Sequence, residues 1–222
     1  MTSAMKNFSI IMALAVCMFL IACGNENKTQ PSALESKSTH TTTKVEPRSQ
    51  CIHIYRYGTF PEAKAKQLKA MLEKVYPSVT LADEAIDFPE GSYYKPRDRY
   101  KGTGLLDDLR KRREGGYALG LTNKIIYQEN EISPTFGIFG ISYMGDSVSV
   151  ISSLRPRTLK PLTDDDLQEL MLHELGHAFG LPHCKDEQCM MVDAEHGYKF
   201  AQTQSFCPSC RDYLNNKGWT LR

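Results

Sequence analysis

The chain has 222 residues, of which 41% are hydrophobic and 24% are charged, and its formal net charge is +1. These values are ordinary for a globular protein. The sequence also has no basic stripe suited to nucleic acid and no acidic tract, so we expect no nucleic-acid partner.

The first element in chain order is an apolar run from Phe8 to Ala22, preceded by Lys6. It is short for a membrane span of about 20 residues and is typical of a signal peptide. It ends in "LIAC", Leu20 to Cys23, which resembles a bacterial lipobox. That resemblance implies a lipoprotein signal peptide over residues 1–22, cleavage before Cys23 and lipid on the Cys23 sulfur. A plain membrane anchor and a secretory signal cut nearby remain the alternatives.

Residues 23–50 contain almost no large apolar side chains after the lipobox cysteine. Such a segment cannot bury enough surface to offset its ordering entropy. We therefore predict a disordered tether that holds a domain of residues 51–222 on a membrane of the bacterial cell envelope.

The domain opens with a predicted strand, helix and strand, and this order favours a βαβ unit. Residues 104–114 indicate a second helix, which Gly115 and Gly116 close. A third strand follows over 117–123, and the next five residues are expected to extend it. The expected elements are strand 51–57, helix 61–76, strand 78–83, helix 104–114 and strand 117–123 with its extension 124–128.

A β-rich stretch over 136–153 contains Gly145-Asp146, which predicts a turn between two strands. The segment 163–180 then reads as a helix. Thr163 is a good N-cap for it, and the three aspartates that follow favour the positive end of the helix dipole.

Half of the six histidines lie in "HELGHAFGLPHC", residues 173–184. His173 and His177 are four apart, so a helix directs both to one face. Gly180 can adopt the left-handed conformation that ends a helix, and Pro182 prevents its continuation. The chain then turns and brings His183 back. Three neutral imidazoles bind Zn²⁺ and leave a fourth position for water.

Glu174 lies beside the first of these histidines. A zinc ion with three imidazoles activates water, and hydrolysis needs a base to take the proton from that water. The position of Glu174 in this motif is that of the base. The sequence therefore predicts a zinc metallopeptidase in which Glu174 is catalytic.

Four of the seven cysteines follow as two short pairs, with the spacings C-x4-C and C-x2-C. This grouping favours a closed structural zinc site, giving two zinc ions per chain. Two disulfides are the alternative in an oxidising compartment. Cys51 falls in the first strand and is expected to be a buried thiol. The four paired residues are Cys184, Cys189, Cys207 and Cys210.

Together, "HELGHAFGLPHC", "CMM" and "CPSC" resemble the archaemetzincin family of metallopeptidases. The resemblance implies a metzincin-like α/β (α+β) fold: a mixed twisted sheet, an active-site helix and a small zinc-stabilised C-terminal subdomain. It also implies that Met191 is the methionine of a tight turn near the imidazoles. The ligands implied are His173, His177 and His183 for the catalytic zinc and the four paired cysteines for the structural zinc.

The predicted substrate is a peptide or protein, which an edge strand within 136–153 would bind by adding it to the sheet. The sequence leaves the oligomeric state open. For His196 and Tyr198 we favour packing over catalysis. The alternatives are an envelope lipoprotein that binds zinc without catalysis and an interaction module on a degenerate peptidase fold, and the intact Glu174 speaks against both.

Overall fold

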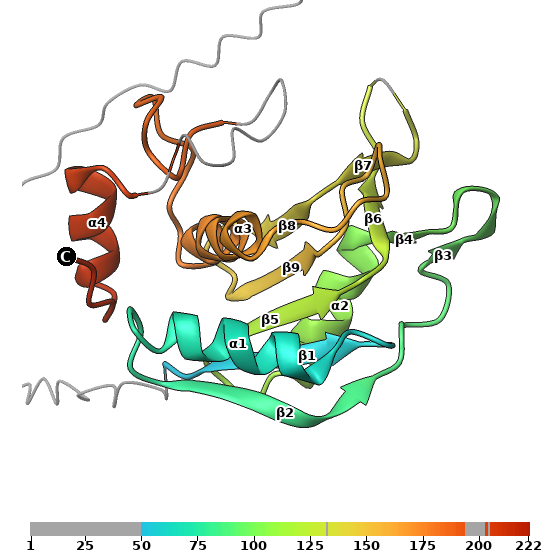
Figure 1. The fold of residues 1–222 in the computed structure, drawn as a ribbon, viewed down its shortest axis with the longest axis horizontal. Helices are drawn as coiled ribbons and strands as arrows, with labels where there is room; N and C mark the ends of the chain where they lie inside the picture. Colours follow the sequence, from blue (N-terminus) through green and yellow to red (C-terminus); the bar gives the residue numbers. More distant parts are fainter. Residues whose placement is uncertain (1–49, 132, 194–202, 204) are drawn as a thin grey trace, which may run out of the picture. The chain divides into compact units, whose positions relative to one another are not determined.

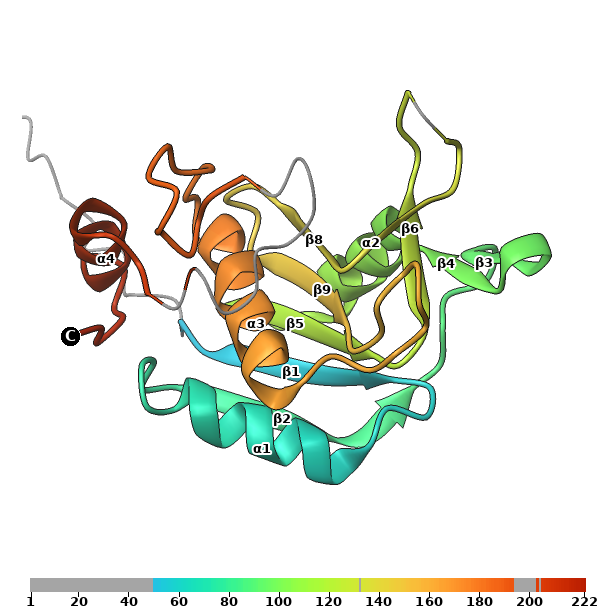
Figure 2. The same ribbon diagram turned by 45° about the horizontal axis from the view of Figure 1, so that its top comes forward.

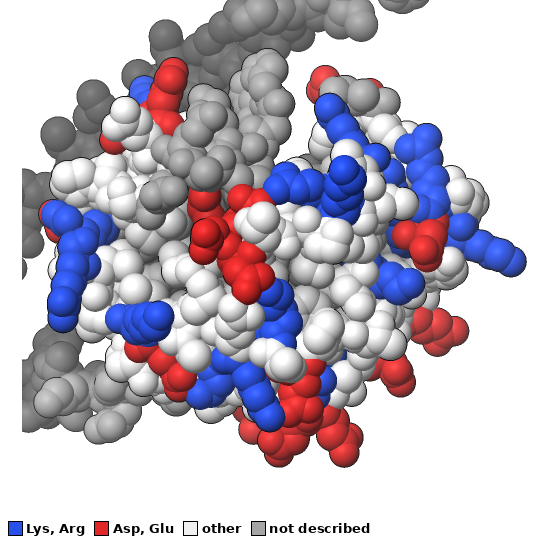
Figure 3. Space-filling model, in the orientation of Figure 1, with Lys and Arg blue, Asp and Glu red and all other residues white. Residues whose placement is uncertain are grey.

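The computed structural model describes residues 50–131, 133–193, 203 and 205–222. The predictions for the signal peptide, Cys23 and the tether lie outside these residues, as do those for His196 and Tyr198. Among the described residues, no helix is both long and apolar enough to cross a membrane. Both basic and acidic side chains occur on the face shown in Figure 3, with uncharged residues between many of them.

The main sheet has five strands in the order β2-β1-β5-β9-β8 (Figure 1). The first four are parallel, whereas β8 runs antiparallel to β9 at one edge. β5 and β9 are almost wholly buried, as parallel strands covered on both faces must be. The strands are β1 (Ile52–Tyr57), β2 (Val79–Ile86), β5 (Tyr117–Thr122), β8 (Gly140–Tyr143) and β9 (Val148–Ser152).

Helices cover both faces of this sheet. α1 (Glu62–Leu72) and α3 (Asp164–Ala178) share one hydrophobic cluster with inward residues such as Ile54. α2 (Gly102–Arg112) packs on the opposite face against Val150 and its neighbours. Figure 2 shows α3 lying across the strands, and it contacts both β9 and β8. The predicted mixed sheet with an active-site helix is confirmed.

The predicted βαβ unit is also confirmed, because β1, α1 and β2 follow one another and β1 pairs parallel with β2. α1 ends at Leu72, earlier than the predicted end at residue 76. Its last turn tightens: the Val75 N–H bonds to the Leu72 carbonyl at 3.0 Å. Tyr76 precedes a proline, and such a residue disfavours the helical conformation.

A second sheet of four strands has the order β3-β4-β6-β7, and the sequence did not predict it. The predicted extension of strand 117–123 is wrong. The Thr122 hydroxyl accepts a hydrogen bond from the Lys124 N–H at 3.0 Å, and the chain bends there into the second sheet. The elements involved are β3 (Tyr93–Tyr94), the short 3-10 helix η1 (Lys95–Arg97), β4 (Arg99–Lys101), β6 (Ile125–Gln128) and β7 (Phe136–Ile138).

Helix α3 has the two predicted end signals. At its N-terminus, Thr163 forms a capping box with Asp166, so each side chain bonds to the other residue's backbone N–H. At its C-terminus, Gly180 has φ +99, and the Leu181 N–H bonds to the Gly176 carbonyl at 2.9 Å. This Schellman-type end turns the chain sharply after the helix.

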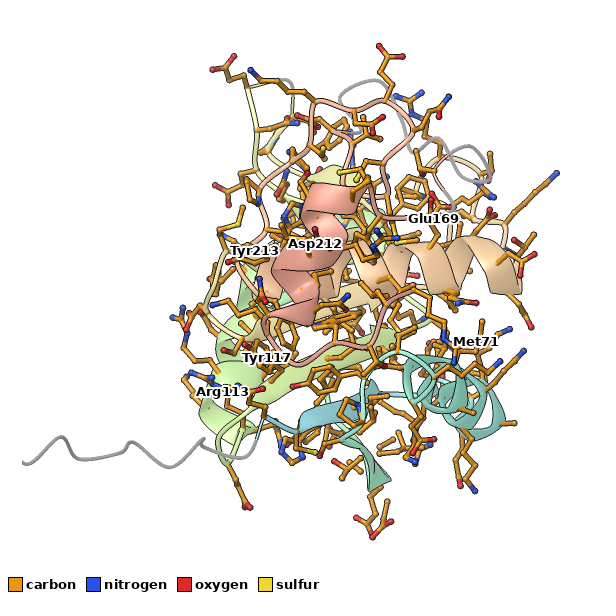
Figure 4. All side chains as sticks on the ribbon, turned by 90° about the vertical axis from the view of Figure 1, so that its left-hand side faces the viewer. Met71, Arg113, Tyr117, Glu169, Asp212 and Tyr213 are labelled. Atoms are coloured by element: carbon orange, nitrogen blue, oxygen red, sulfur yellow. The ribbon has the colours of Figure 1, made fainter. Side chains whose placement is uncertain are left out.

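A fourth helix, α4 (Pro208–Asn215), begins directly after its N-cap Cys207 and contains Cys210, the other member of the second cysteine pair. Its residue Tyr213 donates a hydrogen bond to the Phe179 carbonyl at 3.3 Å, and Figure 4 shows α4 beside the end of α3. After α4, the single tryptophan, Trp219, packs edge-on against Tyr76 and Phe179. The C-terminal segment therefore joins the same hydrophobic cluster as α1 and α3.

Candidate active site and metal centres

The three motif histidines converge at the end of α3. His173 and His177 project from successive turns, with ring centroids 4.6 Å apart. The turn at Gly180 brings His183 to 4.7 Å from the ring of His177 and 5.7 Å from that of His173. One nitrogen of each ring lies within 4.8 Å of the others. We call this group the imidazole triad.

The hydrogen bonds of the two helical histidines fix which nitrogen carries the proton. His173 Nδ1 lies 2.7 Å from the Met190 carbonyl, and His177 Nδ1 lies 2.7 Å from the Leu181 carbonyl. A carbonyl only accepts, so both Nδ1 atoms donate. Burial and the nearby His177 ring lower the pKa of His173 to about 3. Burial also lowers the pKa of His177. Both rings are therefore neutral.

The two Nε2 atoms of these rings therefore carry lone pairs, and they lie only 3.1 Å apart. Lone pairs at this distance repel unless a cation lies between them. With Zn–N bonds of about 2.0–2.1 Å, tetrahedral coordination places two nitrogens about 3.3 Å apart. The donor set and its spacing thus fit a zinc ion.

The third ring lies on the exposed side of the triad. The side chain of His183 is 44% exposed, and its Nδ1 lies 3.3 Å from Asp193 Oδ2. A carboxylate at this position orients the ring so that the other nitrogen faces the metal. Asp193 was not predicted from the sequence, because it comes ten residues after its partner and belongs to no motif.

The side chain of Glu174 is buried where α3 packs against the edge strand β8. Its Oε2 accepts a hydrogen bond of 2.6 Å from the Ser142 hydroxyl, and the hydroxyl of Ser149 donates to its backbone carbonyl at 3.0 Å. Burial raises the pKa of Glu174 to about 7, and the Ser142 hydrogen bond opposes that rise. A carboxylate in this setting titrates near neutral pH, where a proton acceptor and donor is most effective.

Met191 is fully buried and lies against the middle of α3. A Cβ atom at Gly176 would lie 2.6 Å from the Met191 sulfur, so a larger residue at position 176 would displace the Met191 side chain. The neighbouring Met190 supplies the carbonyl that orients His173. The turn over Cys189–Met191 is therefore packed directly under the ligand-bearing helix.

The second group, which we call the thiol cluster, brings together the four paired cysteines. Their sulfur atoms all lie within 4.8 Å of one another, and no disulfide joins any of the five cysteines that the structure describes. The sulfurs of Cys184 and Cys207 are 3.8 Å apart. With Zn–S bonds of about 2.3 Å, tetrahedral coordination also separates sulfurs by about 3.8 Å. Cys51 lies apart from the cluster and is buried, as expected.

The charge state of the thiol cluster depends on a cation. Hydrogen bonding with Ser209 lowers the pKa of Cys207 to about 6, whereas burial raises the pKa of Cys189 and Cys210. The thiols of Cys189 and Cys210 therefore stay protonated at neutral pH on their own. A bound divalent cation removes their protons outright, so this donor set also fits zinc.

Backbone contacts connect the two groups. The Met191 N–H points at the Cys189 sulfur at 3.5 Å, and the Cys184 N–H bonds to the Met191 carbonyl at 2.7 Å. Since the Met190 carbonyl orients His173 and Cys184 follows His183 directly, the thiol cluster holds the segment that positions these two imidazoles.

Comparison with known proteins agrees with this geometry. The model of peptidase family M54 matches residues 159–216, which include both metal-binding groups. Archaemetzincin from Methanopyrus kandleri is 32% identical over 130 residues, covering 57% of this chain and 71% of that protein. Archaemetzincin from Haloquadratum walsbyi is 26% identical over 174 residues, covering 73% of this chain and 98% of that protein.

The chain is also similar to solved structures from the same family as these sequence relatives. The crystal structure of Methanopyrus kandleri archaemetzincin superposes with a TM-score of 0.61 at 25% identity, over 77% of this chain and 97% of that chain. That of Archaeoglobus fulgidus archaemetzincin, complexed with malonate, gives a TM-score of 0.57 at 25% identity, over 73% and 98%.

The fold and the two donor groups together define a zinc-dependent metallopeptidase. Within that class, the chain belongs to the archaemetzincin family, as its motifs indicated. The sequence did not reveal Ser142, Gly140 or Asp193, which contact site residues only through the tertiary fold. For Ser142 and Gly140, the one sequence signal was the predicted edge strand within 136–153, which precedes the metal-binding helix.

Proposed function

We propose that His173, His177 and His183 hold the catalytic zinc and that Glu174 is the general base of peptide hydrolysis. The observation that carries this proposal is the convergence of three imidazole nitrogens beside a buried carboxylate. When bound there, zinc polarises the scissile carbonyl and lowers the pKa of a water molecule toward about 7.

Glu174 then accepts the proton of the attacking water while the water oxygen forms a bond to the carbonyl carbon. When the C–N bond breaks, Glu174 returns that proton to the departing amine nitrogen, so the base is restored. His173 and His177 stay neutral throughout, because each is fixed by its backbone carbonyl and by burial. The buried position of Glu174 strengthens its hydrogen bond with Ser142.

The catalytic role is tested by replacing Glu174 with alanine and measuring peptide turnover and zinc content on the purified protein. We expect both zinc ions to remain and the activity to fall by several powers of ten, since the proton acceptor is lost. Glu187→Ala is the control, because Glu187 is an exposed residue of a loop. Its peptide turnover and zinc content should match those of the parent. A Glu174→Ala protein that hydrolyses peptides at the parental rate would end this proposal.

For the thiol cluster we propose a second, structural zinc ion, which gives two per chain. The unlinked sulfurs and their spacing support zinc over two disulfides. Cys207→Ser should leave one zinc per chain by metal analysis and reduce stability, because binding energy at such a site is folding energy. Cys51→Ser, a buried thiol outside the cluster, should keep two. Equal zinc content in both variants would contradict the second site.

The proposed substrate is an extended peptide that adds to the free edge of β8. β8 ends the five-stranded sheet, and Ser142 on this strand contacts Glu174, so a peptide paired there lies beside the base. Backbone pairing binds any extended peptide, whereas preference for particular side chains needs pockets.

We further propose that the mature protein is a lipoprotein of the bacterial envelope, anchored through Cys23 as the "LIAC" sequence predicts. Cells fed a labelled fatty acid should incorporate it into the parent protein but not into Cys23→Ser. The control is Cys17→Ser, at a cysteine within the predicted signal peptide, and this variant should be labelled like the parent. Cys23→Ser should also leave the membrane fraction. Label on Cys23→Ser would contradict the anchor.

A further inference from the structure

The edge strand β8 presents alternate residues to its neighbour β9. Phe139, just before the strand, accepts a hydrogen bond from the Ser152 N–H at 2.8 Å, and this pair sets the register. In an antiparallel ladder, hydrogen-bonded residues alternate with residues whose backbone groups point the other way. The N–H and C=O groups of Gly140 and Ser142 therefore face the outer edge, where no strand of the described chain pairs.

The same two residues contact Glu174 on α3. The Ser142 hydroxyl donates to Oε2 of Glu174 at 2.6 Å, in a buried setting where a hydrogen bond is stronger than in water. A Cβ atom at Gly140 would lie 2.5 Å from Oε1 and 2.6 Å from Cγ of Glu174. One residue thus holds the carboxylate, and the other leaves the space in which it lies.

The neighbouring strand makes this arrangement rigid. Ser149, paired directly with Ser142 on β9, lies 3.0 Å from the Ser142 hydroxyl and donates to the backbone carbonyl of Glu174 at 3.0 Å. The two hydroxyls therefore hold both the helix backbone and its carboxylate against the sheet.

We propose that Ser142 is a positioning residue that holds the Glu174 carboxylate for reaction. The outer backbone groups of Gly140 and Ser142 pair with the substrate peptide. One strand then contacts both the base and the scissile peptide, so β8 sets the separation between them. Errors of about 1 Å in such placement cost on the order of 100-fold in rate. The inference rests on the proposed roles of Glu174 and β8.

A purely structural role for Ser142, attaching α3 to the sheet, makes a different prediction. Loss of that attachment would lower stability and disturb the histidines of α3, so zinc content would fall with activity. Loss of positioning alone leaves the fold, the metal and the peptide-binding edge intact and slows only the chemical step.

The test compares Ser142→Ala and Ser142→Thr with Ser152→Ala. Ser152 is a matched control: it is a buried serine of β9 whose hydroxyl donates to the Lys124 carbonyl at 2.8 Å, away from Glu174. Each purified protein is measured for kcat, KM, zinc content and melting temperature. Calorimetric titration with a substrate peptide, carried out with each substitution in the zinc-loaded Glu174→Ala background, measures affinity without turnover.

For Ser142→Ala we expect kcat to fall about 10- to 100-fold, while KM, zinc content and peptide affinity stay within about twofold of the parent. Ser142→Thr keeps the hydroxyl and should recover most of kcat, and Ser152→Ala should match the parent. Parental kcat in Ser142→Ala, loss of its zinc, or a threonine variant as slow as alanine would each overturn the inference.

The Glu174→Ala variant separates this inference from the proposed function. If Glu174→Ala is inactive and Ser142→Ala is fully active, only the positioning role fails. If Glu174→Ala keeps parental activity, the base assignment fails and the positioning role fails with it.

Discussion

At the scale of single residues, Met191 shows how tightly the site is packed. It is fully buried, and its sulfur occupies the space that Gly176 leaves on α3. Met191→Ala should lower the free energy of unfolding by about 2–5 kcal/mol, because it leaves a cavity under the helix. Met191→Leu conserves the volume and should cost less than about 1.5 kcal/mol. Urea unfolding of the zinc-loaded proteins measures both, and equal losses would contradict this packing role.

Whether a site residue could be predicted from the sequence depends on how far along the chain its contact partner lies. His173, His177 and Glu174 could be predicted because their geometry is that of one helix, and a glycine and a proline mark where His183 returns. Ser142 lies 32 residues before its partner Glu174, so only the packing of β8 on α3 brings them together. No local pattern encodes such a contact.

At the scale of elements, the capping box of α3 gives a direct prediction. Thr163→Ala removes the hydroxyl that accepts the Asp166 N–H at 3.2 Å and should lower the free energy of unfolding by about 1 kcal/mol. Thr220→Ala, with an exposed side chain near the C-terminus, should change it by less than about 0.5 kcal/mol. Thermal unfolding of both variants checks this, and an unchanged Thr163→Ala protein would argue against the cap.

The free edge of β8 gives a second prediction at this scale. Ser142→Pro removes an N–H that points outward, so the ladder to β9 survives. We expect it to raise KM more than tenfold, an estimate based on loss of backbone pairing to the peptide. Ser142→Ala keeps the N–H and serves as the control for KM. If both variants show the parental KM, the peptide binds elsewhere.

Elements were predictable where a local signal marks their ends. The N-cap Thr163 and the C-terminal Gly180 set the bounds of α3, and Gly145-Asp146 marked the turn between β8 and β9. β6 was read as an extension of β5, because both segments are apolar and only a two-residue bend separates them. Periodicity identifies a strand but not the sheet to which it belongs.

At the scale of the whole molecule, stability should depend on the metal. An ion that binds only the folded state adds about 2.7 kcal/mol when it is present at 100 times its dissociation constant. Removal of zinc by excess chelator should therefore lower the melting temperature measured by scanning calorimetry, and zinc, but not magnesium, should restore it. Identical melting temperatures with chelator and with zinc would contradict a folding role for the metal.

The family, the α/β class and the peptidase activity were predictable, because short motifs over residues 173–210 carry them. The second sheet was not, since its strands are only two to four residues long. Local periodicity requires longer elements than these.

Trp219 follows α4, which is capped by Cys207 and contains Cys210, and it is the only indole in the chain. It lies buried among the rings of Tyr76, Phe179 and Phe206. Its emission spectrum therefore reports on whether the C-terminal segment is docked. Release of metal from the thiols next to it should shift that emission to the red, so the integrity of this end of the protein can be followed optically, in real time and without any substrate.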